Sequence, residues 1–285
     1  MKELTLNNDC YKSHTDTYYI IMDLQLQDKT AFISGSTAGI GFATAHRLLQ
    51  EGATVIINGR SQEGVDKAID ELKKLVVDAN VSGIAADFSK VADIDALLKK
   101  LPEVDILINN AGIFEPKPFA EIPDEDWFRF FEINVMSGVR LSRHYFPLML
   151  KKNWGRIIFI SSESAVFIPE EMIHYGMTKT AQLAVSRGLA ELTKGTNVTV
   201  NSILPGPTKS QGVGTFIDDL AKANNSSAEE VEKDFFNTAR PSSLIQRFAS
   251  VDEVANMIVY TVSPLASATN GASIRVEGGL IRSIV

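Results

Sequence analysis

The chain has 285 residues, of which 45% are hydrophobic and 22% are charged, a composition typical of globular proteins and unlike that of a disordered chain. Its length suits a single α/β domain. The net charge of −7 and the isoelectric point near 5.2 exclude the broad basic surface of nonspecific nucleic-acid binding, so we expect no nucleic-acid partner.

Residues 1–23 are predicted to be a flexible N-terminal extension, because regular patterning begins only near residue 24. The longest apolar run in it is YYII at 18–21, far shorter than the roughly 18 residues of a membrane-spanning helix, and no signal-peptide pattern follows. Cys10 is the single cysteine, so no intrachain disulfide can form. We expect a cytoplasmic protein with no membrane partner.

Short β-branched runs alternate with segments of helical spacing through residues 24–285. The runs predicted to be buried strands are residues 30–34, 54–58, 81–86, 104–109, 156–161, 197–203 and 273–277. Such alternation implies right-handed crossovers, so we predict one doubly wound α/β domain with a seven-stranded parallel sheet and helices on both faces. Ligands of such sheets bind at the carboxyl ends of the strands.

The stretch SGSTAGIG, residues 34–41, follows the first predicted strand and precedes a helical segment. Gly35 suits a tight turn, Gly39 allows the main chain to approach a pyrophosphate, and Gly41 allows close helix–sheet packing. The helix N-terminus would then face the phosphates. We predict a dinucleotide site, although the spacing departs from G-x-G-x-x-G and a structural turn is the other interpretation.

The second strand runs into INGRSQE, residues 57–63, which has no carboxylate at the strand end where dinucleotide folds usually place one. Arg60 and Ser61 suit a 2′-phosphate instead, because guanidinium is a bidentate phosphate donor. We predict NADP(H) as the preferred cofactor, with NAD(H) as the second option. In the alternative interpretation, Arg60 is a solvated loop charge.

Residues 140–156 contain five basic residues and no acidic residue. They are Arg140, Arg143, Lys151, Lys152 and Arg156. This segment could dock an acidic acyl carrier protein, but a solvated helix face explains the charges as well.

The hexapeptide HYGMTK, residues 174–179, places Tyr175 and Lys179 on one face of a predicted helix. A nearby ammonium favours ionised tyrosine, so Lys179 should lower the pKa of Tyr175. Ser162 ends the fifth strand, where its hydroxyl could donate to a carbonyl oxygen. His174 should face elsewhere, in a structural or surface role.

Other side chains near this site are interpreted more simply. Glu163, Glu170 and Glu171 could bind a cationic substrate, but solvated loop charges are the favoured interpretation. The aromatic residues at 127, 128, 130 and 131 are interpreted as core and subunit interface. Residues 206–243 are predicted to be an irregular substrate lid, because so long a segment between strands is uncommon without a function.

Together these motifs resemble the short-chain dehydrogenase/reductase family of Rossmann-fold oxidoreductases. The resemblance covers residues 24–280, and its marks occur in family order: SGSTAGIG, Asp87, NNAG at 109–112, Asn134, Ser162, Tyr175, Lys179 and NSILPGP at 201–207. The interval from Ser162 to Tyr175 matches the family and selects Ser162 over Ser161. Two departures are Ser34, where threonine is usual, and Glu277, where aspartate is commoner.

The resemblance implies that Tyr175 exchanges a proton with the substrate oxygen and that Ser162 holds that oxygen. Lys179 would bind the nicotinamide ribose, and Asn134 would help hold a water that relays protons. With Arg60 and Ser61, the expected cofactor-binding residues are Gly35, Ser36, Thr37, Gly39, Ile40, Gly41, Asp87, Phe88, Asn110, Ala111, Gly112, Tyr175, Lys179, Pro205, Gly206 and Thr208. No metal site is expected.

We therefore expect an NAD(P)-dependent oxidoreductase that reduces a small-molecule carbonyl to an alcohol, or the reverse. By the same resemblance it should be a homo-oligomer, either a tetramer or a dimer. One alternative is a 3-oxoacyl-acyl-carrier-protein reductase. Another is a non-catalytic NADP-binding regulator, although such a protein has no chemical need for Asn134, Ser162, Tyr175 and Lys179.

Overall fold

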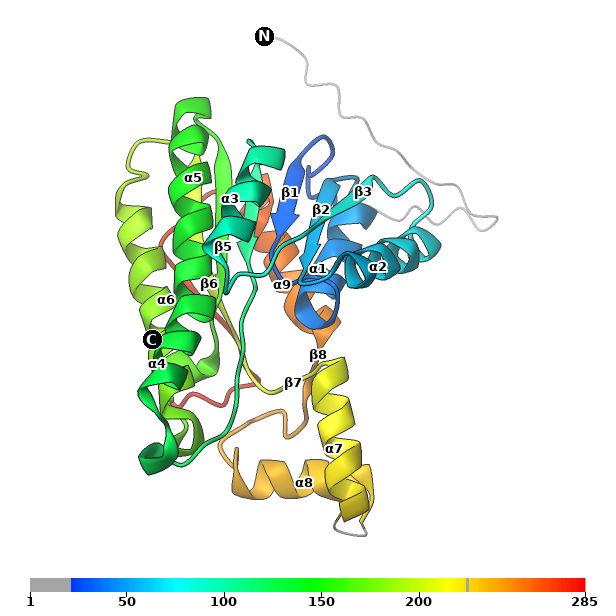
Figure 1. Ribbon diagram of the computed structural model, residues 1–285, viewed down its shortest axis with the longest axis vertical. Coiled ribbons are helices and arrows are strands. Elements are labelled where there is room, and N and C mark those ends of the chain that lie inside the picture. Colours follow the sequence, from blue (N-terminus) through cyan, green and yellow to red (C-terminus); the bar gives the residue numbers. More distant parts are fainter. Residues whose placement is uncertain (1–21, 224–225, 285) are drawn as a thin grey trace.

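The computed structural model describes residues 22–223 and 226–284, so all but two residues of the predicted extension 1–23 lie outside it. A seven-stranded parallel sheet of order β3-β2-β1-β4-β5-β6-β9 forms its centre (Figure 1). The strands are β1 (Thr30–Ile33), β2 (Thr54–Gly59), β3 (Val81–Ala85), β4 (Ile106–Asn109), β5 (Gly155–Ile160), β6 (Val198–Pro205) and β9 (Ser273–Val276). The predicted sheet and its seven strands are confirmed.

Helices cover both faces of the sheet, as predicted. The helices α1 (Gly39–Gln50), α2 (Gln62–Leu75) and α9 (Val251–Val262) pack on one face. The helices α3 (Val91–Lys100), α5 (Ser137–Lys152) and α6 (Ile173–Glu191) pack on the other. Apolar residues spaced three or four apart make each inner face, as Val65, Ala68 and Leu72 do in α2.

The predicted lid is not irregular but largely helical. It contains α7 (Gln211–Ala223) and α8 (Ala228–Thr238), which lie apart from both helical layers (Figure 1). The N-terminus of α8 has a capping box, in which Ser227 and Glu230 satisfy each other's backbone N–H groups. Ile217 and Phe236 of the lid form a small apolar core with Phe248, which follows the lid in the chain.

Two short strands and several tight turns complete the chain. The strands β7 (Thr208–Lys209) and β8 (Ala249–Ser250) pair in parallel at the base of the lid. The 3-10 turns are Phe119–Glu121, Glu163–Ala165, Glu170–Met172 and Pro264–Ala266.

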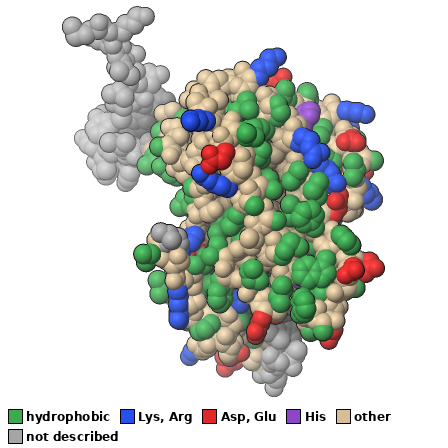
Figure 2. All heavy atoms as spheres, turned by 90° about the vertical axis from the view of Figure 1, so that its left-hand side faces the viewer, with side chains coloured by type: hydrophobic (Ala, Val, Ile, Leu, Met, Phe, Trp, Pro, Cys, Tyr) green, Lys and Arg blue, Asp and Glu red, His purple; other side chains and the backbone are tan. Residues whose placement is uncertain are grey.

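The helix α4 (Asp124–Phe131) continues through a π-helical segment, Glu132–Met136, into α5. Phe130 is fully buried, whereas Phe128 and Phe131 are exposed. The face that carries α4, α5 and α6 shows many hydrophobic side chains (Figure 2). His174 is buried against Phe130, with ring centroids 4.1 Å apart, so its predicted structural role fits its position.

The basic segment 140–156 is mostly unavailable for docking. Arg156 is buried and donates to main-chain carbonyls, while Arg140 and Lys152 each pair with a carboxylate from a neighbouring element. Of the five basic residues in this segment, Arg143 and Lys151 are exposed and have no such partner among the described residues. Within the same residues, no helix is long and apolar enough to cross a membrane.

Candidate active site

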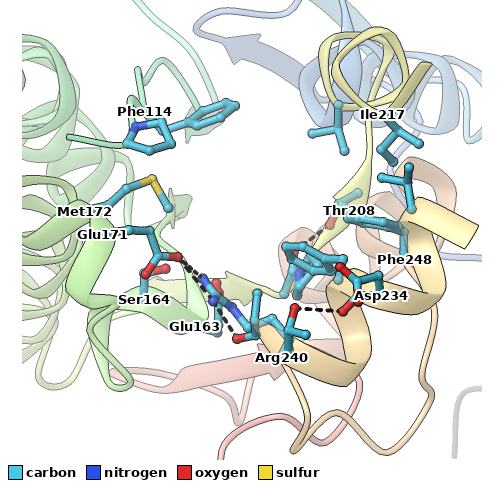
Figure 3. A pocket seen from close by; sticks show the side chains of 18 of the residues that line it. Phe114, Glu163, Ser164, Glu171, Met172, Thr208, Ile217, Asp234, Arg240 and Phe248 are labelled. Atoms are coloured by element: carbon cyan, nitrogen blue, oxygen red, sulfur yellow. Dashed lines mark hydrogen bonds and ion pairs between the residues drawn. The ribbon is translucent and has the colours of Figure 1, made fainter. Parts of the chain in front are cut away.

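Two adjoining cavities open at the carboxyl edge of the sheet. The large cavity, of about 650 Å³, lies between the sheet and the lid (Figure 3). The small cavity, of about 230 Å³, lies closer to the glycine turn. The residues that line both are Phe114, Ser162, Tyr175, Gly206, Thr208 and Val213. The two predicted catalytic hydroxyls therefore stand where the cavities meet.

The glycine turn has the shape that a pyrophosphate requires. Gly35 and Gly39 have φ angles of 61° and 60°, in the left-handed region that glycine tolerates. A Cβ on Gly41 would lie 2.7 Å from the Gly35 carbonyl oxygen, so only glycine fits there. The N-terminus of α1 begins at Gly39, and its free N–H groups favour an anion. These features fit a dinucleotide cofactor.

Buried and half-buried polar side chains hold this turn in place. Asn110 Nδ2 donates to the carbonyl oxygens of Ser34 and Gly35, at 3.0 and 2.7 Å. Asn58 Oδ1 accepts the Gly35 N–H at 3.0 Å, and Ser36 Oγ donates to a main-chain carbonyl at 2.7 Å. The side chains of Ser36 and Asn110 thus support the turn. Asn58 was missed, although an asparagine ending the apolar run TVII was a visible signal.

The residues predicted to contact the adenosine end of the cofactor are on the whole less buried than those of the glycine turn. Arg60 is exposed, and among the described residues its guanidinium has no hydrogen-bond partner. Hydrogen bonds from Ser89 hold the pKa of Asp87 below its usual range, and the charge of Arg60 contributes. Ser61 Oγ caps α2 by accepting a backbone N–H, while the ring of Phe88 packs in the core. Only the main chain of Phe88 can therefore face a ligand.

The small cavity lies where the nicotinamide end is predicted. The small cavity is lined by Ile40, Asn110, Gly112, Tyr175, Lys179, Pro205, Gly206 and Thr208 from the predicted cofactor set. Ala111 packs against Gly35, and Thr37 lies against Gly59.

Tyr175 and Lys179 lie on one face of α6, as predicted. Lys179 Nζ is 5.5 Å from the Tyr175 ring centroid and donates to the carbonyl oxygen of Ile160 at 2.9 Å. The Phe114 ring meets Tyr175 edge-on. Ser161 Oγ donates to the Lys179 carbonyl at 2.8 Å, which leaves Ser162 as the serine beside Tyr175.

The expected direction of the Tyr175 pKa is wrong for this structure. Burial raises the pKa of the phenol, the Glu163 carboxylate raises it further, and only the hydrogen bond with Ser162 lowers it. Burial also lowers the pKa of Lys179 to about 8. The prediction considered the ammonium alone, whereas the loss of water around the phenol dominates. Tyr175 is therefore protonated at neutral pH and is an available proton donor.

Asn134 is fully buried inside the π-helical segment. Its side chain accepts the Ile113 N–H at 2.8 Å and donates to Ile113 O and Thr178 Oγ1, both at 3.0 Å. Gln182 donates to its main-chain carbonyl at 2.6 Å. Asn134 thus ties the loop after β4 to α6. Its predicted role in holding a water stays a prediction.

The interpretation of the acidic residues as solvated loop charges is wrong for Glu163, which is 5% exposed. Its carboxylate accepts a hydrogen bond from Ser162 Oγ and lies 3.5 Å from Arg240 Nε. Arg240 also pairs with Glu171 at 3.2 Å. We call these three charged residues, Glu163, Arg240 and Glu171, the charged bridge (Figure 3). Holding a substrate oxygen requires the Ser162 hydrogen to turn from Glu163 toward the cavity.

Arg240 was not identified from the sequence, since an arginine before a proline carries no local signal. It follows α8, so the charged bridge connects the lid to the turn that contains Ser162. At the C-terminal turn, Glu277 accepts backbone N–H groups from Leu280 and Ile281. The Gly278 carbonyl accepts the Leu244 N–H at 2.8 Å, which anchors the end of the lid.

Comparisons with known proteins agree with this geometry. A model of the short chain dehydrogenase family matches residues 29–220. The Bacillus subtilis protein "uncharacterized oxidoreductase YvrD" is 53% identical over 266 residues, which cover 92% of this chain and 100% of that protein. The 3-oxoacyl-[acyl-carrier-protein] reductase FabG of Aquifex aeolicus is 31% identical over 264 residues, covering 91% and 100% of the two chains.

Solved structures of reductases are similar to this fold. The L-sorbose reductase of Gluconobacter frateurii, complexed with NADPH and L-sorbose, superposes with a TM-score of 0.86 at 30% identity, over 92% of this chain and 100% of that one. An actinorhodin polyketide ketoreductase with NADPH superposes with a TM-score of 0.80 at 28% identity, over 90% and 98%.

Proposed function

Because the chain belongs to the short-chain dehydrogenase/reductase family, we propose that it is an NADP(H)-dependent reductase that converts a carbonyl compound to an alcohol. One observation carries the proposal: Ser162 and Tyr175 line both cavities. A carbonyl oxygen in the large cavity and a nicotinamide in the small cavity would meet at these two hydroxyls.

A bound NADPH would supply the hydride for the carbonyl carbon. As that carbon is reduced, the Tyr175 hydroxyl donates its proton to the carbonyl oxygen, and Ser162 orients the same oxygen. The raised pKa of Tyr175 favours this direction, since the phenol holds its proton until the substrate oxygen becomes basic. Lys179 would bind the nicotinamide ribose from the small cavity.

The cofactor preference rests on two observations. Arg60 is exposed beside Asp87, where a 2′-phosphate would gain a guanidinium donor that has no hydrogen-bond partner among the described residues. In addition, the related sorbose reductase and polyketide ketoreductase were both solved with NADPH.

Reduction of a 3-oxoacyl carrier-protein thioester is the second candidate, because the FabG relative is 31% identical over nearly the whole chain. Its support from the basic segment 140–156 is weak, since Arg140, Lys152 and Arg156 are paired or buried. A regulator that binds NADP without turnover has less support, because Tyr175 and Ser162 are placed at the junction of the cavities.

Assembly and location are part of the proposal. The exposed Phe128 and Phe131 suit a subunit interface, so we propose a homotetramer or homodimer, which light scattering of the purified protein would test. A single cysteine, Cys10, outside the described residues, fits a cytoplasmic location.

The experiment that tests the function measures NADPH and NADH oxidation with a panel of ketones, aldehydes, diketones and an acetoacetyl thioester. We expect turnover of one carbonyl class with NADPH and a lower specificity constant with NADH. Tight NADPH binding by fluorescence without turnover of any carbonyl would overturn the proposal in favour of the regulator.

A further inference from the structure

The walls of the large cavity are apolar where they face the junction. Phe114 and Met172 line one side, and Ile217 and Phe248 line the lid side (Figure 3), while Pro116 also belongs to the lining. Tyr175 lines the same cavity. A substrate body that fills it must therefore be mostly apolar, since a polar body would lose its hydrogen bonds to water without replacement.

The charges around the same cavity are unbalanced. Four carboxylates line it: Glu163, Glu171, Glu230 and Asp234. Arg240 is the one basic residue in the lining among the described residues, and it is already paired with Glu163 and Glu171. The described lining thus has a formal net charge of −3, and Glu230 and Asp234 have no cation of the lining as a partner.

Nearby cations do not correct this imbalance. Lys117 follows Pro116 in the chain, but its ammonium pairs with Asp126. Lys209 follows Thr208, but it pairs with Glu232 at 3.3 Å. Glu230 and Asp234 are the exposed carboxylates of the lining, and we call them the rim carboxylates. Hydrogen bonds from Ser227 hold the pKa of Glu230 below its usual range, so it stays ionised at neutral pH.

An anionic substrate would therefore meet repulsion at the rim and would also lose hydration among apolar walls, without gaining an unpaired cation from the described lining of the large cavity. We propose that the large cavity selects uncharged carbonyl compounds with an apolar body and rejects keto acids and phosphate-bearing acyl thioesters. This inference rests on the proposed function and names its substrate class. It places carrier-protein and coenzyme A thioesters outside the range of good substrates.

Three methyl ketones of nearly equal size test the selection. The methyl ester of 5-oxohexanoic acid is uncharged and apolar, 5-oxohexanamide is uncharged and polar, and 5-oxohexanoate carries one negative charge. We expect kcat/KM with NADPH to be highest for the ester, and to be at least about 100-fold lower for the acid, as expected for like charges at short range. The amide should exceed the acid by at least about tenfold, which isolates charge from polarity.

A second pair tests the rejection of phosphate-bearing thioesters. Acetoacetyl-N-acetylcysteamine and acetoacetyl-coenzyme A share the reacting carbonyl, but only the second carries phosphates. We expect the uncharged thioester to be the better substrate. Equal kcat/KM values within about threefold for acid and ester, or a preference for the coenzyme A thioester, would overturn the proposal.

The rim carboxylates are tested by the double variant Glu230→Gln/Asp234→Asn, which keeps the side-chain size and the capping acceptor at residue 230. It should lower the ester-to-acid ratio by at least about fivefold, a change of about 1 kcal/mol. The matched control is Glu229→Gln, on the same helix but outside the cavity lining, and it should leave the ratio unchanged. An unchanged ratio in the double variant would contradict the role of the rim.

Failure of the proposed function can be told apart from failure of this inference. If no ketone is reduced although NADPH binds, the proposed function fails. Calorimetric titration of ester and acid into the NADP⁺ complex then decides the charge selection by binding alone. Tighter binding of the ester supports the inference, and equal binding overturns it.

Discussion

The glycine turn after β1 and the lid formed by α7 and α8 border neighbouring cavities, but they are built differently. The turn is held at the edge of the sheet by its main-chain hydrogen bonds with two side chains: Asn58 Oδ1 accepts the Gly35 N–H, and Asn110 Nδ2 donates to two carbonyls. The lid packs around a small apolar core, and its Arg240 forms an ion pair with Glu163, the residue after Ser162.

This difference indicates which part of the molecule controls turnover and which part controls the preference among substrates. In the proposed function, groups on the sheet edge and α6, whose positions the fold fixes, act on every substrate. Apart from Gly206, Thr208, Ser210 and Val213, the lid residues that line these two cavities border only the large one. Changes on the first side should lower turnover for all substrates, and changes on the second should alter stability of the lid or preference among substrates.

The largest effect is expected for Tyr175→Phe, which removes the proton donor and keeps the ring. We expect kcat to fall about 10³-fold for every substrate, within the usual range of general acid catalysis, while the NADPH dissociation constant changes little. The control is Tyr260→Phe, which removes an exposed hydroxyl on α9. A kcat within tenfold of the wild-type value in Tyr175→Phe would contradict the mechanism.

Arg240→Met should be the most destabilising change in the lid. It leaves Glu163 buried without its cation, and breaking such a pair costs about 3 kcal/mol of unfolding free energy. Arg247→Met is the matched control, because Arg247 forms an exposed pair with Glu253 that is worth below about 1 kcal/mol. Urea unfolding measures both, and equal losses would show that the charged bridge has no special role.

The variant Arg60→Ala tests the cofactor preference, which we assign to the sheet edge and not to the lid. Loss of one charge-assisted phosphate contact should reduce the NADPH-over-NADH ratio of kcat/KM by about tenfold, or about 1.4 kcal/mol, with the NADH value unchanged. Lys67→Ala, on the exposed face of α2, should leave the ratio as it is. An unchanged NADPH-over-NADH ratio in Arg60→Ala would show that groups other than Arg60 bind the 2′-phosphate.

The smallest effect is expected for Glu163→Gln, as a shift in pH dependence. The Glu163 carboxylate raises the pKa of both Tyr175 and Lys179, and the pKa of Lys179 is about 8. In the proposed mechanism Tyr175 donates a proton and Lys179 acts as an ammonium, so we expect reduction to be lost as pH rises through their pKa values. Removing the carboxylate lowers both pKa values, and the alkaline limit of kcat/KM should move down by about half a pH unit.

The control for this shift is Glu171→Gln, which removes the half-exposed carboxylate of the charged bridge while Glu163 stays. Its alkaline limit should stay where the wild type has it. A shift to higher pH in Glu163→Gln would reverse the sign of the proposed electrostatic influence.

The sheet, its helices and the glycine turn were predictable because their signals are local. Strand runs such as TAFIS and the glycines at 35, 39 and 41 each specify their own conformation. The placement of Tyr175 and Lys179 on one face followed from helix geometry alone.

The lid helices were missed because Gly212, Gly214 and the stretch NNSS resemble loop residues. The capping box of Ser227 and Glu230 was present in the sequence and would have indicated the start of α8. The burial of Glu163 had no local signal, because its partner Arg240 comes from a distant part of the chain. The direction of the Tyr175 pKa depends on burial, which only the folded chain determines.

The most direct test of the central claim follows the hydrogen itself. NADPH deuterated at both C4 positions is incubated with the enzyme and the best ketone of the panel, and the product alcohol is analysed by mass spectrometry. The account predicts one deuterium on the carbinol carbon for each NADPH oxidised, and no labelled alcohol with Tyr175→Phe beyond about a thousandth of the wild-type rate. NADPH oxidation without deuterium in the alcohol, or labelled alcohol at the wild-type rate without the Tyr175 hydroxyl, would contradict it.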